Sequence, residues 1–423
     1  MKQFQMHIII YFSLLLVIPQ INYENTDRNI VNRYPTDEEI MIPAGRYQSN
    51  INMENNAQVQ FTSPREEPIV EWSLTVPDLD PGSLMVDNKG YIWYSEDLKH
   101  NHSQRNITCL EPFGIKIMTI PIYGVQEVWP ILICANLIIF QEKNYADSLI
   151  SLRCIDSNGL TVWCSEPVKS YSFWPRAWRL SGNRFMIPVG KSNLEIFNIY
   201  SLYDGKLLNR IKFPEYDGEA WYLGPLNLPD GGWISCTDTG ITKFQPNFDI
   251  AWRYNISEPF LNSRPVYSPN GMLIIGDSTK LSAVDIKSGN QIWENKDSGN
   301  YRPIGFTPKG NFIAYSENCL SAFDIKGNHL WSTRAGSYKP FPDADLLIYK
   351  DSSILFFDQE NLNLISANGD IIWTLNITYL LGNHPIAISD CYLNPAPDGR
   401  IILSFKNLGE PDDTLIVSLR SQT

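Results

Sequence analysis

The sequence has few of the residues that build reactive or metal-binding sites. Its 423 residues include only 5 His and 7 Cys, and no two cysteines are adjacent or spaced as Cys-x-x-Cys. This set excludes a disulfide-held fold, a zinc cluster and a redox dithiol. The Gly-x-Ser-x-Gly and His-Glu-x-x-His motifs and the phosphate-binding Gly-rich loop followed by Lys-Ser/Thr are also missing. The sequence therefore carries no familiar catalytic motif, and we expect no catalytic residue and no metal site.

Positive charge is also in short supply. Lys and Arg number 34 against 46 Asp and Glu, which gives a formal net charge of -12 and a pI near 5.0. Such a surface repels nucleic acids and anionic membranes on average, so neither is an expected partner. The hydrophobic share of 43% and the aromatic share of 12% are those of a globular chain with a large core.

Long apolar runs are absent except at the N-terminus. Lys2 is the only formally charged residue among residues 1–23, and it precedes the apolar run IIIYFSLLLVI at residues 8–18. This pattern predicts a signal peptide at 1–23 and a secreted or periplasmic protein, with an uncleaved anchor as the alternative. The polar stretch 24–68 is interpreted as a linker or arm. Residues 69–423 remain for the folded domain.

A Gly-x-x-x-Trp repeat organises that domain. It occurs in LRCIDSNGLTVW (152–163), AVDIKSGNQIW (283–293), AFDIKGNHLW (322–331) and LISANGDIIW (364–373), whereas 26 Gly and 12 Trp would give roughly one such pair by chance. Alternating apolar residues flank a tight turn in each copy, which is typical of a β-hairpin. The Trp falls on the returning strand, where its ring can dock between neighbouring sheets.

Degenerate copies extend the repeat along the chain. The docking position recurs about every 43 residues, with Met118 and Asn209 in place of Trp, and the predicted docking tryptophans are Trp72, Trp163, Trp252, Trp293, Trp331 and Trp373. A second turn-and-strand unit lies between successive copies, as in SPNGMLIIG (268–276) and APDGRIILSF (396–405). Two hairpins per period predict a β-propeller with four-stranded antiparallel blades.

The end of the chain is one strand short of a complete blade. Three strands are predicted after Trp373, near Ile386, at 400–405 and at 414–419, and VEWSL around Trp72 stands alone near the N-terminus. We expect this isolated strand to complete the last blade and remove the open edge. The prediction is an all-β, eight-bladed propeller, with seven blades as the alternative count.

The repeat resembles that of a known family. AVDIKSGNQIW is similar to the Ala-x-Asp-x-x-x-Gly-x-x-x-Trp docking repeat of pyrroloquinoline-quinone-like propellers, with Ala283, Asp285, Gly289 and Trp293 matching. The resemblance covers residues 70–420 and implies the propeller fold. Quinoprotein dehydrogenases of this family carry an adjacent-cysteine disulfide, a calcium site and a catalytic Asp. None of these maps onto this chain, so we expect no cofactor.

One further pattern suggests a binding rim. An aromatic or cationic residue precedes Pro at the start of several innermost strands, as in VWPIL (128–132), SRPVY (263–267) and YRPIG (301–305). Because these strand starts converge at one mouth of a propeller channel, we predict a partly basic rim that could bind an anionic ligand or a sugar. The alternative is that Pro only separates strands while the cations form salt bridges. The rim residues are Trp129, Trp174, Arg176, Trp178, Arg264, Arg302, Lys339 and His384.

Two cysteines flank one docking turn. Cys154 and Cys164 lie on either side of the SNG turn, and we consider a cross-strand disulfide between them, with two buried thiols as the alternative.

The sequence as a whole favours an exported, monomeric, non-catalytic propeller that binds a protein, peptide or carbohydrate. The alternative is an enzyme whose site lies at the channel mouth, either a quinone-dependent oxidoreductase or a metal-dependent, lactonase-like hydrolase.

Overall fold

The computed structural model divides the chain into two units, 1–34 and 35–423, and all described residues belong to the second. The structure describes residues 62–421 except 78, 80–83, 98–103, 135, 145, 170–176, 181, 190–195, 213–225, 238–239, 257–264, 269, 297–300, 317–318, 336–345, 359–360, 383–385 and 408–412.

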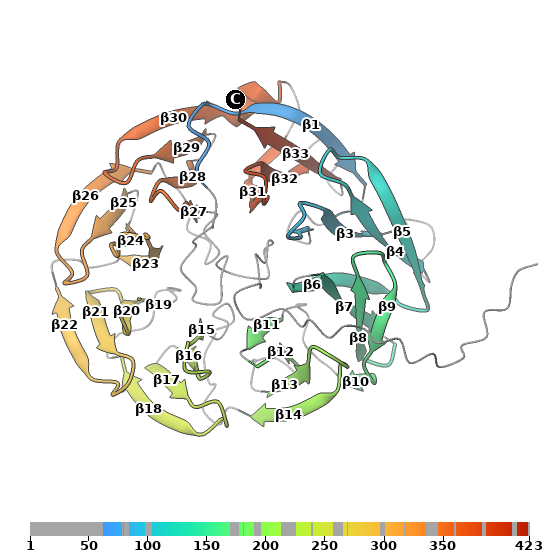
Figure 1. Cartoon of the computed structure of the whole chain (residues 1–423), viewed down its shortest axis with the longest axis horizontal. Coiled ribbons are helices and arrows are strands. Elements are labelled where there is room, and N and C mark those ends of the chain that lie inside the picture. The colour runs from blue at the N-terminus through green and yellow to red at the C-terminus, as the bar shows by residue number, and fades with distance from the viewer. Residues whose placement is uncertain are drawn as a thin grey trace, which may run out of the picture. The chain divides into compact units, whose positions relative to one another are not determined.

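This unit is an eight-bladed β-propeller, as the repeat predicts (Figure 1). Blade 1 contains β2 (Met85–Val86), β3 (Ile92–Asp97), β4 (Gln104–Leu110) and β5 (Lys116–Tyr123). Blade 2 contains β6 (Glu127–Cys134), β7 (Leu137–Asn144), β8 (Leu149–Asp156), β9 (Thr161–Cys164) and β10 (Val168–Lys169). Blade 3 contains β11 (Trp178–Leu180), β12 (Arg184–Pro188), β13 (Ile196–Ser201) and β14 (Leu207–Lys212). Blade 4 contains β15 (Leu226–Asn227), β16 (Trp233–Thr237), β17 (Gly240–Phe244) and β18 (Ile250–Asn255).

The second half of the ring repeats this plan. Blade 5 contains β19 (Val266–Tyr267), β20 (Met272–Gly276), β21 (Leu281–Asp285) and β22 (Gln291–Asn295). Blade 6 contains β23 (Arg302–Phe306), β24 (Phe312–Ser316), β25 (Cys319–Phe323) and β26 (His329–Arg334). Blade 7 contains β27 (Leu346–Ile348), β28 (Ile354–Asp358), β29 (Asn361–Ile365) and β30 (Ile371–Asn376), followed by the short helix α1 (Ile377–Leu380). Blade 8 contains β31 (Ile386–Pro395), β32 (Ile401–Asn407), β33 (Thr414–Arg420) and β1 (Ile69–Val76).

Every blade is antiparallel, and the first strand of each lies innermost (Figure 1). Blade 2 departs from the four-strand plan, because β9 and β10 both pair with β8. The hydrophobic core consists of clusters between neighbouring blades, since each blade covers the apolar face of the next.

The docking tryptophans join the blades in a uniform way. The indole N–H of Trp72 donates to the carbonyl of Pro112 at 3.0 Å, and that of Trp331 donates to the carbonyl of Ala367 at the same distance. Equivalent bonds join Trp163 to Leu202, Trp252 to Ile286, Trp293 to Ile325 and Trp373 to Pro64, at 2.9–3.0 Å. Except for Pro64, each acceptor lies in the docking turn of the next blade.

The Gly of the repeat also belongs to this joint. Gly369 has a φ of +84°, and a Cβ there would lie 2.7 Å from the Trp331 ring. The recurring spacing therefore links two different joints, because each Gly packs on the docking residue of the preceding blade, which is Met118 for Gly159 and a Trp for the other glycines of the repeat.

One joint replaces both residues together. Asn209 stands in the Trp place of blade 3, and Phe248 of blade 4 takes the Gly place with a φ of +75°. Arg184 lies over the Phe248 ring at 5.4 Å and donates to the carbonyl of Pro246 at 3.4 Å, which is the carbonyl that a docking Trp would use. At this joint the contact between Arg184 and Phe248 replaces the contact between a docking Trp and a Gly.

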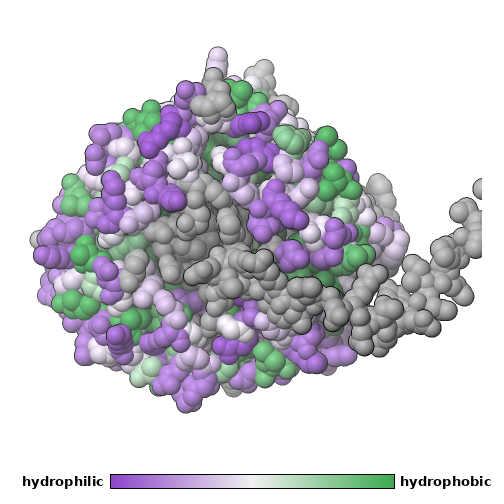
Figure 2. Space-filling view, in the orientation of Figure 1, coloured by the Kyte–Doolittle hydropathy of each residue, from purple (hydrophilic) through white to green (hydrophobic). Residues whose placement is uncertain are grey.

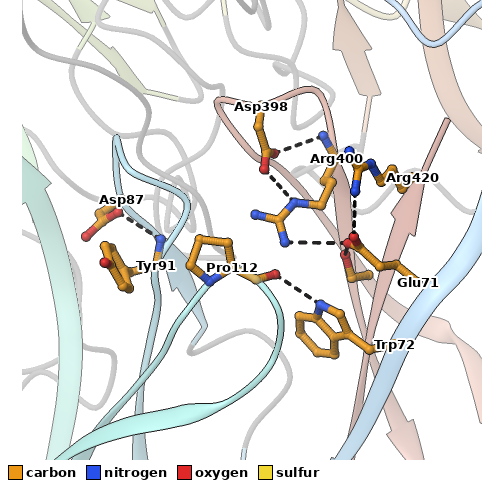
Figure 3. A network of polar contacts seen from close by, with 9 residues as sticks. Glu71, Trp72, Asp87, Tyr91, Pro112, Asp398, Arg400 and Arg420 are labelled. Carbon is orange, nitrogen blue, oxygen red and sulfur yellow. Dashed lines mark hydrogen bonds and ion pairs between the residues drawn. The ribbon is translucent and has the colours of Figure 1, made fainter. Parts of the chain in front are cut away.

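The ring closes as the lone N-terminal strand predicts. β1 pairs with β33 from Ile69–Arg420 to Val76–Thr414, with one bulge. Glu71 of β1 forms ion pairs with Arg420 at 3.1 Å and Arg400 at 3.6 Å (Figure 3). These contacts tie the strand that precedes blade 1 to the strands that end the chain.

Part of the predicted arm belongs to the propeller. Residues 62–68 precede β1, and Ser63 and Arg65 both bind Asp351 of blade 7 at 2.8 Å. Blade 8 has no covalent turn between β33 and β1, so the carbonyl of Pro64 provides the acceptor that Trp373 would otherwise find in that turn. The ordered domain therefore begins several residues before Ile69.

Candidate binding surface

The predicted rim is only partly covered by the described residues. Trp129 in β6 is half-buried, and its indole N–H donates to Glu127 at 3.3 Å. Arg302 begins β23 opposite Tyr315, and burial lowers the pKa of its guanidinium while Tyr315 opposes that shift. Trp174, Arg176, Arg264, Lys339 and His384 lie outside the described residues.

The two rim prolines within the described strands have a structural effect. The pairing of β6 with β7 shifts register after Pro130, and that of β23 with β24 shifts after Pro303. Because these are innermost edge strands, a residue without an N–H and an adjacent bulge are tolerated there. Pro130 and Pro303 thus lie within their strands, and binding of a ligand at the rim stays a prediction.

Trp178 is a core residue, which corrects its assignment to the rim. It is 7% exposed and packs edge-on against Phe197, with ring centroids 5.8 Å apart. Both belong to a buried cluster with Trp233 and Phe244 of blade 4. Its side chain therefore points between blades 3 and 4 and presents no surface to a ligand.

The predicted Cys154–Cys164 disulfide also needs correction, because both cysteines are free thiols. Cys154 lies opposite Trp163, and Cys164 lies opposite Arg153. Since successive residues of a strand face opposite sides, the two thiols point away from each other, one buried and one exposed. Burial also raises the pKa of both thiols.

We expect mass spectrometry of the non-reduced protein to show Cys164 alkylated by iodoacetamide and Cys154 unmodified. The reason is that only Cys164 is exposed, while Cys154 is fully buried. After unfolding without reductant, both should react. A species in which neither reacts until reductant is added would contradict the assignment.

The structure reveals an apolar surface that no sequence motif indicates. Large apolar side chains that are 48–65% exposed lie in the outer strands of blades 8, 1 and 2 or in the turns that lead into them. We call them the outer apolar strip: Ile69, Phe113, Ile115, Ile117, Leu160 and Val162. Figure 2 shows hydrophobic residues along the periphery of the described surface.

The docking joints make this strip continuous. The turn that carries Phe113 packs on Trp72 of β1 through Gly114, and the turn that carries Leu160 packs on Met118 and Ile120 of β5 through Gly159. Six side chains at this exposure offer roughly 500 Å² of apolar area, at the upper end of the range for the largest patch of a monomeric protein. By contrast, the outer strands of blades 4 to 7 each expose one such residue, namely Ile250, Ile292, Leu330 and Ile371, and that of blade 3 exposes two, Leu207 and Leu208.

Other kinds of site are not found in the described ranges. No group of three or more His, Cys, Asp and Glu side chains there is arranged to hold a metal ion. No helix among these residues has the length and hydropathy needed to span a bilayer.

No protein-family model and no curated protein matches the chain. Among solved structures, the chain is similar to BamB from Moraxella catarrhalis, with a TM-score of 0.50 and 13% identity. The similarity covers 84% of this chain and all of that structure. At this identity the likeness shows the fold alone, an eight-bladed propeller of four-stranded blades.

Proposed function

We propose that the protein is an exported, non-catalytic binding or scaffold propeller whose ligand is a protein, and that the outer apolar strip is its contact surface. The observation that carries this proposal is the uneven distribution of exposed apolar residues around an otherwise regular ring. A repeat fold alone would expose similar residues in every blade. Blade 1 differs most, because it exposes Phe113, Ile115 and Ile117 where blades 4 to 7 expose one such residue each, and blade 2 adds Leu160 and Val162 beside it.

The composition of the strip supports a protein ligand. Protein interfaces combine an apolar centre with a polar rim, and a standard one buries about 800 Å² per partner, somewhat more than half of it apolar. The strip offers an apolar area of this order. Lys116, which pairs with Glu96 at 2.7 Å, and the Glu71–Arg420 pair lie on the same outer strands and supply polar groups around it.

Introducing charged residues into the outer apolar strip tests the proposal. The variant Ile115→Lys/Leu160→Lys is expected to lose partner binding at least about 10-fold, because two charged groups would have to be desolvated at the apolar centre. The control Ile292→Lys/Leu330→Lys makes the same change at exposed apolar residues of the outer strands of blades 5 and 6, which are 49% and 47% exposed. This control should bind like the unmodified protein.

Binding is measured by photo-crosslinking from position 117 in extracts of the source cell envelope, with position 292 as the reference site. A crosslinked protein that is lost in the strip variant and kept in the control supports the proposal. Equal crosslinking from both positions, or equal loss in both variants, contradicts it.

A further inference from the structure

Polar side chains lie among apolar ones in the contact surface between blades 8 and 1, which we call the seam. Asn394, Ser404, Thr414 and Ser418 come from β31, β32 and β33, and each is 0% exposed. Asn394 and Ser418 lie opposite Ile402, and Ser404 lies opposite Ile416. Residues directly opposite each other share a sheet face.

Blade 1 contributes to the same surface. Ile402 and Ile416 form one buried cluster with Ile92, Tyr94 and Leu110 of blade 1. Asn394, Ser404, Thr414 and Ser418 of blade 8 therefore face blade 1. Thr108 of β4, also 0% exposed, lies opposite Tyr94 and so faces blade 8.

Several seam groups are buried without a hydrogen-bond partner in the described part of the chain. They are both amide atoms of Asn394, the Thr108 hydroxyl and both terminal nitrogens of Arg400. These make up five of the eight such atoms found in the described residues. Closing this surface therefore removes water from polar groups and gives less in return than closing an apolar surface.

The other blades show what normally occupies the place of Asn394. In blade 8 the turn after β31 is closed by the bond from Ala396 N–H to the Arg400 carbonyl, and Asn394 precedes Ala396 by two residues. The same turn bond begins at Asp87, Leu228, Ser268, Thr307 and Tyr349 in blades 1, 4, 5, 6 and 7. Two residues before these stand the buried apolar residues Met85, Leu226, Val266 and Leu347 and, in blade 6, the buried Gly305, so none has a polar side chain.

We propose that the ring has a built-in opening point, at which β31–β33 separate both from β1 and from blade 1. β1 would remain with blade 1, because Trp72, Leu74 and Val76 pack in the blade 1 cluster and Trp72 donates to Pro112. The face uncovered on blade 8 carries the buried polar residues Asn394, Ser404, Thr414 and Ser418 beside Ile402 and Ile416.

Glu71 holds this opening point closed through its polar contacts. Its carboxylate binds Arg420 of β33 at 3.1 Å, accepts from the Ser418 hydroxyl at 3.3 Å and lies 3.6 Å from Arg400 (Figure 3). All three partners lie on the blade 8 side of the separation, whereas Glu71 lies on β1. Opening the ring therefore breaks every one of these contacts at once.

Native-state hydrogen exchange on the full chain tests the opening point. β33 is compared with the third strands of other blades, β21, β25 and β29, since these occupy equivalent places. We expect the amides of β33 to exchange together with those of β1 and about 10-fold faster than those of β21, β25 and β29. Glu71→Gln should accelerate exchange in β1 and β33 alone.

A variant with the opposite expected effect completes the test. Asn394→Leu restores the residue type found in blades 4 and 7 and should slow exchange in β33 about 10-fold while leaving β21 unchanged. Thr108→Val tests the facing side of the seam in the same way and serves if Asn394→Leu does not fold. Equal exchange rates in all four third strands, or β33 rates that neither variant lowers, would overturn the proposal.

Discussion

A chain shortened to begin at Pro77 is expected to lose its cooperative fold, whereas one shortened to begin at Thr62 is expected to keep it. The first lacks β1, so β33 loses its outer partner and blade 8 keeps three strands. Trp72, Leu74 and Val76 also leave the cluster between blades 8 and 1. Burial of Val76 and partial burial of Trp72 and Leu74 contribute about 3–6 kcal/mol, a large part of the whole stability of a typical domain, about 5–15 kcal/mol.

Thermal unfolding followed by circular dichroism and size-exclusion chromatography would measure the difference. The chain that begins at Thr62 keeps Ser63, Pro64 and Arg65 with their contacts to blade 7, and should melt as one transition like the full chain. The shorter chain should aggregate, because β33 would present an unpaired seven-residue edge that includes the apolar residues Leu415, Ile416, Val417 and Leu419. A monomeric, cooperatively melting chain without β1 would show that the ring does not depend on its N-terminal strand.

The fold could be predicted from the sequence because the joint between blades has a strict local signature. A positive φ next to an aromatic ring leaves room only for Gly at positions such as Gly327 and Gly369, so the turn and the docking Trp appear at fixed spacing. The joint between blades 3 and 4 escaped the pattern because its aromatic residue lies on the turn. Phe248 and Arg184 are 64 residues apart in the chain, and no local spacing reveals their contact.

The predicted site residues depended on strand register, which the sequence did not specify. Trp178 lies three residues after Pro175 and four after Trp174 in the sequence, but its place in the three-residue strand β11 directs it into the core. Cys154 likewise lies opposite Trp163, one residue short of Cys164. A shift of one residue exchanges the two faces of a strand, so spacing alone could not decide either question.

Part of the outer apolar strip could have been predicted from the residue directly before each docking position. Val162 precedes the docking residue Trp163, and Ile117 precedes Met118 in the Trp place. Because alternate residues face opposite sides, an apolar residue beside the docking position must face away from the joint. What the sequence could not show is that Phe113, Ile115 and Leu160 lie beside them across the joints.

Gly369→Ala is expected to lower the free energy of unfolding far more than Gly310→Ala. Both glycines have nearly the same φ, +84° and +86°, so both variants carry the same backbone cost of about 1 kcal/mol. A Cβ at Gly310 meets nothing within 4 Å, whereas one at Gly369 would lie 2.7 Å from the Trp331 ring. The ring must then move, which weakens its packing and its bond to the Ala367 carbonyl and adds about 2–4 kcal/mol.

A double-mutant cycle separates the ring contact from the backbone cost. In a Trp331→Ala background the Cβ at position 369 no longer meets an indole, so Gly369→Ala should cost only about 1 kcal/mol there, as Gly310→Ala does. Denaturant unfolding of the four proteins of the cycle and of Gly310→Ala gives each free energy. Equal costs of Gly369→Ala with and without Trp331 would mean that the glycine serves the turn alone. The Gly-x-x-x-Trp repeat would then be two independent signals, with no joint between blades linking them.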